Sequence, residues 1–425
     1  MIDANGDGRP TAASADGMGG RRAPRPSTRW PYLPRTVGFA GISAAMVAVL
    51  VAAGAPTPLW PIYEKQWGFP EWELTLAFGV YALALLVAIL VIGSLSDHIG
   101  RRPLMIAALA VELVAMVMFL SASSIGWLIA ARIVQGVATG AASSALSAAV
   151  VELAPERRKK FGAMMASVAP LAGLGIGALF AGILAQFVSD AAVTVWLVLV
   201  VVMAIGTVIT VFTPETSSRK PGAVASLVPR VSVPPQVRGV FASTLPGTIS
   251  AFMAMALFLG LVPIVLGAVF AVRGPVVGAL VAFVAFGAGT VVSAVTAGVR
   301  PHRLRLVGAS AMTVGALLFI GSVGAEALPL LWAVAVFSGA GLGASLSGTI
   351  RGLVPEVKPH ERAALFAAIF LVAYLALGVS AIVAGQFIGP VGVTSVAISF
   401  GIVNAIVALA GVVVTSTTAA DHRQA

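Results

Sequence analysis

Apolar segments of about 20 residues recur along the chain, and each is long enough to cross the roughly 30 Å of hydrocarbon in a bilayer. Charged residues make up 10% of the 425 residues and hydrophobic residues 59%, whereas a soluble globular protein carries about 25% charged residues. Because a chain so poor in charge must place apolar surface against lipid, we predict an all-α membrane protein. The predicted spans are residues 36–59, 74–96, 103–122, 126–151, 161–186, 191–213, 238–268, 275–298, 304–324, 328–351, 362–386 and 391–416.

The spans divide into two sets of six. A Gly-, Pro- and Arg-rich stretch precedes them and predicts a disordered tail, while the first span is too long for the apolar region of a signal peptide. The sequence Leu-Ala-Pro-Glu at 153–156 recurs as Leu-Val-Pro-Glu at 353–356, which indicates parallel repeats of six helices with a site between them. The predicted organisation is tail 1–35, bundle 36–213, linker 214–237, bundle 238–416 and tail 417–425.

The basic residues predict the orientation. Lysines and arginines gather in the two tails and in the loops that follow even-numbered spans, for example at 157–160. Only Lys65, Arg273 and Arg132 fall elsewhere. Cytoplasmic loops accumulate Lys and Arg, so we expect a multi-pass protein of the plasma (inner) membrane with both termini in the cytoplasm. The tryptophans agree with this topology, because six of them fall at or near the outer interface: Trp60, Trp67, Trp72, Trp127, Trp196 and Trp332.

The composition also argues against several functions. The net charge of +10 lies in short groups between spans, unlike the basic face of a nucleic-acid binder, so no nucleic-acid partner is expected. The chain has no cysteine, and its four histidines map to loops or the tail, so we expect no metal site. No Gly-Lys-Ser/Thr phosphate loop occurs. We expect no enzyme and no cofactor, with lipid and a small-molecule substrate as the partners of a monomer.

The sharpest motif lies between the second and third spans. Gly93 and Gly100 permit close backbone approach and a tight turn, and Asp97 could accept backbone N–H bonds from a helix N-terminus. Arg101 could pair with Glu152, forming a latch that holds the ends of the two bundles together in one state. The alternative is a charged turn that only fixes topology. The motif reads Gly93-Ser94-Leu95-Ser96-Asp97-His98-Ile99-Gly100-Arg101-Arg102-Pro103.

This motif resembles the signature loop of the major facilitator superfamily, Gly-x-Leu-x-Asp-Arg-x-Gly-Arg-Arg, except that His98 replaces a base. Arg132-Ile133-Val134-Gln135-Gly136 is similar to the family's Arg-x-x-Gln-Gly motif, and Pro214-Glu215-Thr216 resembles the segment that closes the first half. The resemblance implies twelve helices in two pseudo-symmetric six-helix bundles, most like the drug/proton antiporter type.

The fifth span resembles the family's antiporter motif only in part. Ala169 and Leu174 replace two glycines of Gly-Pro-x-x-Gly-Gly, but Pro170, Gly173 and Gly175 remain as a candidate hinge. The second half has a counterpart of the signature loop at 298–303. It keeps the basic residues of the motif and contains no Asp or Glu.

The fourth span carries a polar stripe. Its spacings of 3, 4, 4 and 4 put five residues on one helix face, which should meet water or protein rather than lipid: Arg132, Gln135, Thr139, Ser143 and Ser147. In the family this helix lines the substrate cavity, so the resemblance implies that the stripe does so here. The alternatives are that the hydroxyls bond back to their own helix and that Arg132 snorkels to the outer surface. Tyr374, with nearby aromatic and Met residues, could form an apolar pocket or could equally be packing.

Glu112 is the one acid near the middle of a span, where a charged group costs about 2.5–3.5 kcal/mol on insertion scales. Arg132 lies at a similar depth on the next helix. Our hypothesis is that Glu112 carries or gates the coupling proton and exchanges between Arg132 and that proton. The alternative is a static ion pair or an interhelical hydrogen bond.

The sequence thus predicts a secondary transporter that works by alternating access and exports small amphipathic compounds in exchange for protons. One alternative is proton symport of a polar metabolite or organic anion into the cell, with Arg132 binding the anionic group. Another is a membrane receptor or enzyme without transport activity.

Overall fold

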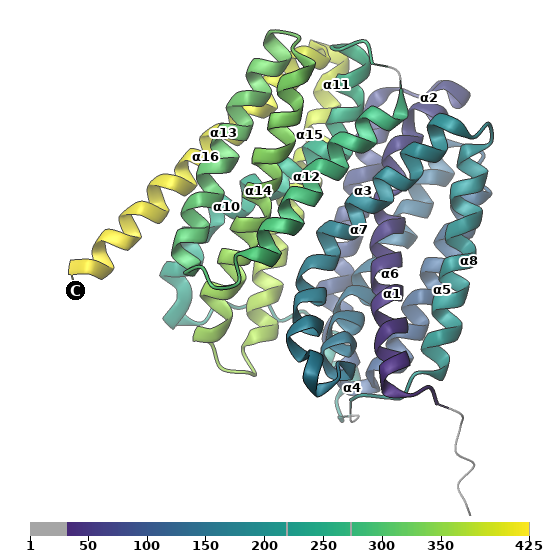
Figure 1. The fold of residues 1–425 in the computed structure, drawn as a ribbon, viewed down its shortest axis with the longest axis vertical. Coiled ribbons are helices and arrows are strands. Elements are labelled where there is room, and N and C mark those ends of the chain that lie inside the picture. Colours follow the sequence, from purple (N-terminus) through teal and green to yellow (C-terminus); the bar gives the residue numbers. More distant parts are fainter. Residues whose placement is uncertain (1–31, 218–219, 273, 425) are drawn as a thin grey trace, which may run out of the picture. The chain divides into compact units, whose positions relative to one another are not determined.

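The computed structural model describes residues 32–217, 220–272 and 274–424. The predicted disordered tail, apart from residues 32–35, lies outside the described residues. Within the described part the secondary structure is helical throughout, and twelve helical segments are long and apolar enough to span a membrane. Each predicted span overlaps one of these segments (Figure 1).

The first six spans form one bundle around a core that includes Ile42, Leu109 and Trp196. The predicted end of the first span, residue 59, is wrong. The span bends at Pro56 and continues until Gly68, which ends the helix with a positive φ of 66°. The elements are α1 (Arg35–Gly54), η1 (Thr57–Leu59), α2 (Trp60–Trp67), α3 (Glu71–Ile92), α4 (Ser96–Ile99), α5 (Arg101–Leu120), α6 (Ile125–Leu153), η2 (Glu156–Arg158), α7 (Lys159–Phe187) and α8 (Ala191–Phe212).

The second bundle repeats this arrangement after the linker. Its last helix continues past residue 416 to Gln424, because residues 417–424 contain no Gly or Pro to end it. The elements are α9 (Ala223–Ser226) and η3 (Pro235–Val237) in and after the linker, then α10 (Arg238–Ala256), η4 (Leu257–Leu261), α11 (Val262–Ala268), α12 (Pro275–Val295), α13 (Pro301–Gly324), α14 (Leu328–Leu353), η5 (Val354–Glu356), α15 (Arg362–Val391) and α16 (Val393–Gln424).

Small residues set the close packing within each bundle. A Cβ added at Gly140 would lie 2.6 Å from the Leu85 carbonyl oxygen of α3, and one at Gly136 would lie 2.5 Å from the Tyr81 carbonyl oxygen. The small-residue ridge of α6 therefore packs directly on the α3 backbone, as small-xxx-small ridges do in membranes.

The two bundles meet mainly through two helix pairs, α3 with α15 and α7 with α12, and Thr57 of η1 also donates to the Leu259 carbonyl oxygen of η4 at 3.2 Å. We call the end of the bundles that carries α4 and the start of α1 the termini side (Figure 1). The close approaches between bundles lie in the middle of the helices and toward the other end, where Gly385 meets Thr75, Gly378 meets Leu83 and Gly182 meets Ala279. The residue numbers in each pair add up to about 460, so both helix pairs are antiparallel.

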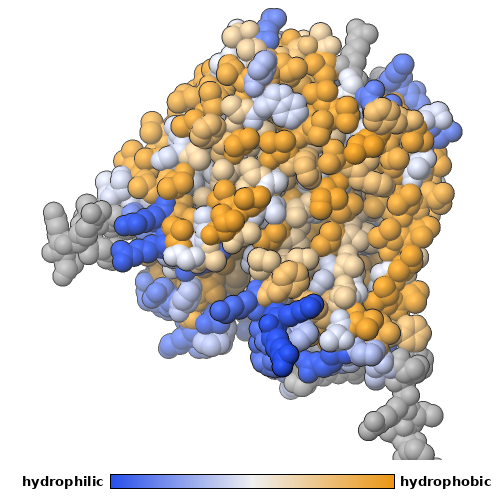
Figure 2. All heavy atoms as spheres, in the orientation of Figure 1, coloured by the Kyte–Doolittle hydropathy of each residue, from blue (hydrophilic) through white to orange (hydrophobic). Residues whose placement is uncertain are grey.

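That register would place Lys160 opposite Arg300 on the termini side. Both are exposed, and a Cβ added at nearby Gly298 would meet nothing within 4 Å. The bundles are therefore closed against each other at the end opposite the termini side and apart at the termini side. The face drawn in Figure 2 carries apolar side chains across its middle and hydrophilic ones mainly at its ends, as a membrane-spanning surface requires.

Candidate gating loop and buried polar cluster

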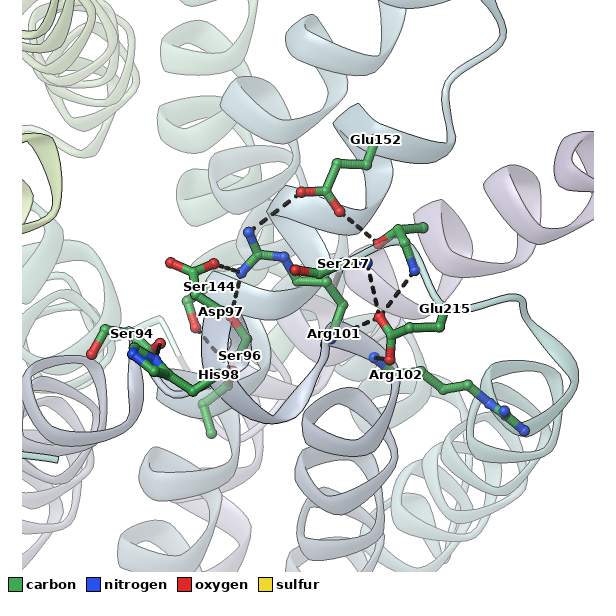
Figure 3. Close-up of polar contacts among 12 residues, drawn as sticks. Ser94, Ser96, Asp97, His98, Arg101, Arg102, Ser144, Glu152, Glu215 and Ser217 are labelled. Carbon is green, nitrogen blue, oxygen red and sulfur yellow. Dashed lines mark hydrogen bonds and ion pairs between the residues drawn. The ribbon is translucent and has the colours of Figure 1, made fainter. Parts of the chain in front are cut away.

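Arg101, the first residue of α5, is held by acidic groups on two sides (Figure 3). Its guanidinium lies 2.6 Å from Asp97 Oδ1 and 3.3 Å from Glu152 Oε1, and it also donates to Ser96 Oγ. The turn that brings these groups together depends on Gly100, whose φ of 102° disfavours any other residue.

The sequence predicts that Asp97 accepts backbone N–H bonds from a helix N-terminus, but among the described residues Asp97 pairs with Arg101 and accepts no such bond. Glu215 accepts these bonds instead, from the Arg101 N–H at 2.9 Å and the Arg102 N–H at 3.1 Å. These N–H groups have no partner within α5, and a carboxylate is favoured at this end of the helix dipole. Sequence reasoning missed this role, although the Pro-Glu-Thr segment around Glu215 was the available signal.

The signature loop is also tied to the end of α6. Glu152 accepts from the Thr216 hydroxyl at 2.6 Å while its other oxygen faces Arg101. Arg102 donates to the Val211 carbonyl oxygen on α8. The loop, α6, α8 and the segment after α8 therefore form one polar network.

This network corrects the expectation that the latch joins the two bundles. Among the described residues, the partners of Asp97, Arg101 and Glu152 in this conformation belong to the first bundle or to the segment just after α8, and none belongs to the second bundle. The reason is that the bundles stand apart on the termini side, so the second bundle is out of reach.

The second bundle replaces this acidic network with carbonyl groups. Arg351, near the end of α14, donates to the carbonyl oxygens of Thr296 at 2.7 Å and Ser293 at 3.1 Å. Those carbonyls lie at the C-terminus of α12, where a positive charge is favoured. Arg305 donates to Ser243 Oγ at 3.1 Å. Neither arginine has an acidic partner among the described residues.

Glu112 lies inside the first bundle, completely buried. Its two carboxylate oxygens accept from Gln135 Nε2 at 3.3 Å and from Thr139 Oγ1 at 3.2 Å. Three residues of the predicted stripe, Arg132, Gln135 and Thr139, thus point into the bundle beside α5 rather than toward an open cavity.

The sequence predicts that Arg132 pairs with Glu112, but the two side chains are not direct partners in the structure. The Arg132 guanidinium donates at 2.6 Å to Gln135 Oε1, and the Gln135 amide stands between the two charges. No ion pair joins them among the described residues. Arg132 lies about one helical turn farther from the termini side than the atoms that meet Glu112, which explains the intervening amide.

Arg132 also does not snorkel to the surface. It is 1% exposed, its guanidinium carbon lies 4.1 Å from the ring centroid of Tyr81, and it reaches the Ala53 carbonyl oxygen at 3.5 Å. A cation over an aromatic face gains about 2 kcal/mol or more when desolvated. Tyr81 therefore takes the place that a carboxylate would fill in an ion pair.

The other stripe residues behave differently. Ser143 is half-buried and donates to the Thr139 carbonyl oxygen of its own helix at 2.7 Å, which is the back-bonding alternative. Ser147, also half-buried, lies 4.0 Å from Met46 Sδ.

Tyr374 lies on α15 of the second bundle. Its ring meets Phe252 edge-on at 5.5 Å between centroids and tilts against Phe370 at 6.0 Å. It belongs to an aromatic row on α15 rather than to the α6 stripe.

The hinge candidates on α7 lie at two interfaces. α7 runs without a break through Pro170. A Cβ at Gly173 would overlap Leu50 of α1, and one at Gly175 would come within 3.2 Å of Phe286 of α12. Gly175 therefore belongs to the bundle interface. Among the described residues no group of three His, Asp or Glu side chains could hold a metal ion.

Comparisons with known proteins add the family relationship. The family model described as Major Facilitator Superfamily matches residues 39–381. The crystal structure of the human organic anion transporter MFSD10 (TETRAN) resembles this fold with a TM-score of 0.65 and 16% sequence identity, over 89% of this chain and all of that one. No curated protein sequence matches the chain.

Proposed function

This chain belongs to the major facilitator superfamily, and from that premise we propose that it is a proton-coupled exporter of small amphipathic compounds. Family and fold point to a membrane transporter rather than an enzyme. In the proposal the chain works as a monomer without a cofactor, spans the plasma (inner) membrane, and has both termini in the cytoplasm. The termini side is then the cytoplasmic side, and the described conformation takes substrate from the cytoplasm.

The observation that carries the coupling proposal is the surroundings of Glu112. Its carboxylate is completely buried, its two hydrogen-bond donors among the described residues are neutral, and the Gln135 side chain separates it from Arg132. A buried charge is costly unless it is paired. The free energy of keeping Glu112 ionised therefore depends on how closely the guanidinium of Arg132 approaches it.

The hydrogen bonds from the cluster to α1 show how the distance between Arg132 and Glu112 could change. Gln135 also donates to the Ala52 carbonyl oxygen of α1 at 3.0 Å, and Arg132 reaches the neighbouring Ala53 carbonyl. A shift of α1 against α6 would release the amide and let Arg132 close on Glu112. We propose that Glu112 holds a proton in one state and pairs with Arg132 in the other, so that each cycle carries one proton inward while substrate leaves.

The test uses everted vesicles with an acidified lumen and a luminal pH probe. On addition of an amphipathic fluorescent dye that the wild-type chain exports, we expect proton release from the lumen in the wild type and in a control, Glu64→Gln, whose acid lies on α2 outside the cluster. Glu112→Gln keeps the size of the side chain and should abolish proton release. If Glu112→Gln still exchanges dye for protons at the wild-type rate, the coupling proposal is wrong.

A second candidate is transport of an organic anion. It is favoured because no carboxylate in the described part of the chain pairs directly with Arg132, and because the structurally similar MFSD10 is titled an organic anion transporter. Arg132 would then meet the anionic group when α1 shifts away from α6. Arg132→Lys should retain part of the uptake of an anionic dye and Arg132→Gln none. Equal loss of anionic and cationic dye transport in both variants would contradict this candidate.

A further inference from the structure

The linker between the bundles is attached to the first bundle at the signature loop. The Lys220 N–H donates to the His98 carbonyl oxygen at 3.2 Å, and Ser94 Oγ donates to the Ser226 carbonyl oxygen at 2.9 Å. Gly222, with a φ of 97°, turns the chain beside the His98 ring. The first part of the linker is therefore fixed at the termini-side end of α3.

The far part of the linker is attached to the second bundle. The Ser232 N–H donates to the Ala364 carbonyl oxygen at 3.4 Å, and Gln236 Nε2 donates to Glu361 Oε2 at 3.2 Å. Both acceptors lie where α15 begins. The linker thus crosses from α3 to α15, on the side of the molecule where these two helices meet.

Between the two attachments the linker presents apolar side chains that the protein does not cover. Val224 is 82% exposed and Val228 65%, and Leu227 and Val231 are exposed as well. Apolar side chains on a membrane-spanning helix are exposed because they face lipid. The linker does not span the membrane, since it connects two spans at their ends, so this explanation does not apply to its side chains. An exposed apolar cluster of this kind marks a candidate interaction site.

The charges around these side chains indicate the partner of this site. Lys220 and Arg230 are exposed in the same segment, and the sequence contains no Asp or Glu between Glu215 and Glu326. Basic residues interleaved with apolar ones at a span's end are attracted to anionic lipid headgroups. Val87 lies one turn from the α15 contact Leu83 on α3 and is 57% exposed, so α3 and α15 are apart close to this level.

We propose that linker residues 220–231 bind the anionic surface of the bilayer, with Val224 and Val228 inserted between headgroups and Lys220 and Arg230 paired with lipid phosphates. Bound in this way, the linker covers the separation between α3 and α15 on the termini side. The linker is then attached at three places: to the first bundle, to the second bundle and to the bilayer surface.

The absence of cysteine allows a single-label test on the full chain. Val224→Cys carries an environment-sensitive fluorophore, and the protein is reconstituted in vesicles of phosphatidylcholine with and without phosphatidylglycerol, with brominated acyl chains as the quencher. The matched control is Glu156→Cys, on the same side of the protein, where the side chain is 85% exposed. We expect quenching and a blue shift at 224 in anionic vesicles and neither at 156.

Charge removal tests the electrostatic part. In the doubly substituted Lys220→Gln, Arg230→Gln chain the ratio of inserted to free label should fall about fivefold for each base removed. Both positions are exposed, so the fold should be retained, and an unchanged elution profile checks this. Equal quenching at 224 and 156, equal quenching in neutral and anionic vesicles, or protection of 224 only when a second protein or a second copy binds would each overturn the proposal.

Discussion

Gly385 on α15 allows the closure of the bundles at the end opposite the termini side. A Cβ added there would overlap Thr75 Oγ1 of α3 and lie 2.7 Å from Thr75 Cβ. Thr75 cannot easily move aside, because it is 1% exposed and its hydroxyl donates to the Trp72 carbonyl oxygen at 2.8 Å. We therefore predict that Gly385→Val destabilises the closed arrangement of this end and leaves each bundle folded.

The magnitude follows from the cost of overpacking. Extra methyl groups in a well-packed interface cost about 1–3 kcal/mol, and here the cost applies only to the state in which α3 and α15 touch. The population should therefore shift toward opening at this end by a factor of about 5 to 150. Gln386→Val is the matched control on the same helix, since the side chain of Gln386 is exposed.

The assay is maleimide labelling of a single cysteine placed at Ala381, which is 3% exposed on the same face of α15. With Gly385→Val the labelling rate should rise by the same factor, and with Gln386→Val it should remain unchanged. If both valine variants label at the rate of the Ala381→Cys parent, glycine packing does not control closure and the reasoning fails.

Two further predictions concern stability. Glu215→Gln should lower the thermal stability of the detergent-solubilised chain by about 0.5–2 kcal/mol, since it weakens the cap of α5; a loss no larger than that of Glu156→Gln, on an exposed ion pair with Lys159, would contradict the capping role. Gly339→Ala should cost about 1–3 kcal/mol or more because the new methyl group overlaps the Ala285 backbone of α12. Gly287→Ala, with open space around it, should leave the melting temperature unchanged, and equal melting temperatures would show that α12 and α14 are not packed this closely.

The spans were predictable, because hydrocarbon thickness and hydropathy act on each segment independently. Their division into two bundles was predicted from the internal repeat and from the family resemblance. The convergence of Glu112, Gln135 and Thr139 was partly predictable, since helical spacing places the stripe on one face. The amide between Glu112 and Arg132 was not, because sequence places residues at a depth only to within about a turn.

The contacts that sequence reasoning missed depend on the arrangement of whole elements. Glu215 caps α5 only because α8 returns the chain to the start of α5, more than a hundred residues later. The residues that Asp97, Arg101 and Glu152 contact depend on whether the bundles are apart or together. The sequence is the same in both states, so it does not specify which contacts are made. The attachment of the linker to His98 and Ala364 likewise has no periodic signal.

The most direct test of the account is the distance between the bundles at both ends, measured with spin labels on paired cysteines in the cysteine-free chain. One pair replaces Lys160 and Arg300 on the termini side, and the other replaces Gln66 and Thr394 at the opposite end; all four positions are exposed. If the two bundles rock against each other, conditions that shorten the first distance lengthen the second. Distances that stay fixed, or that lengthen together, when pH and exported dye are varied would contradict alternating access by rocking of the two bundles.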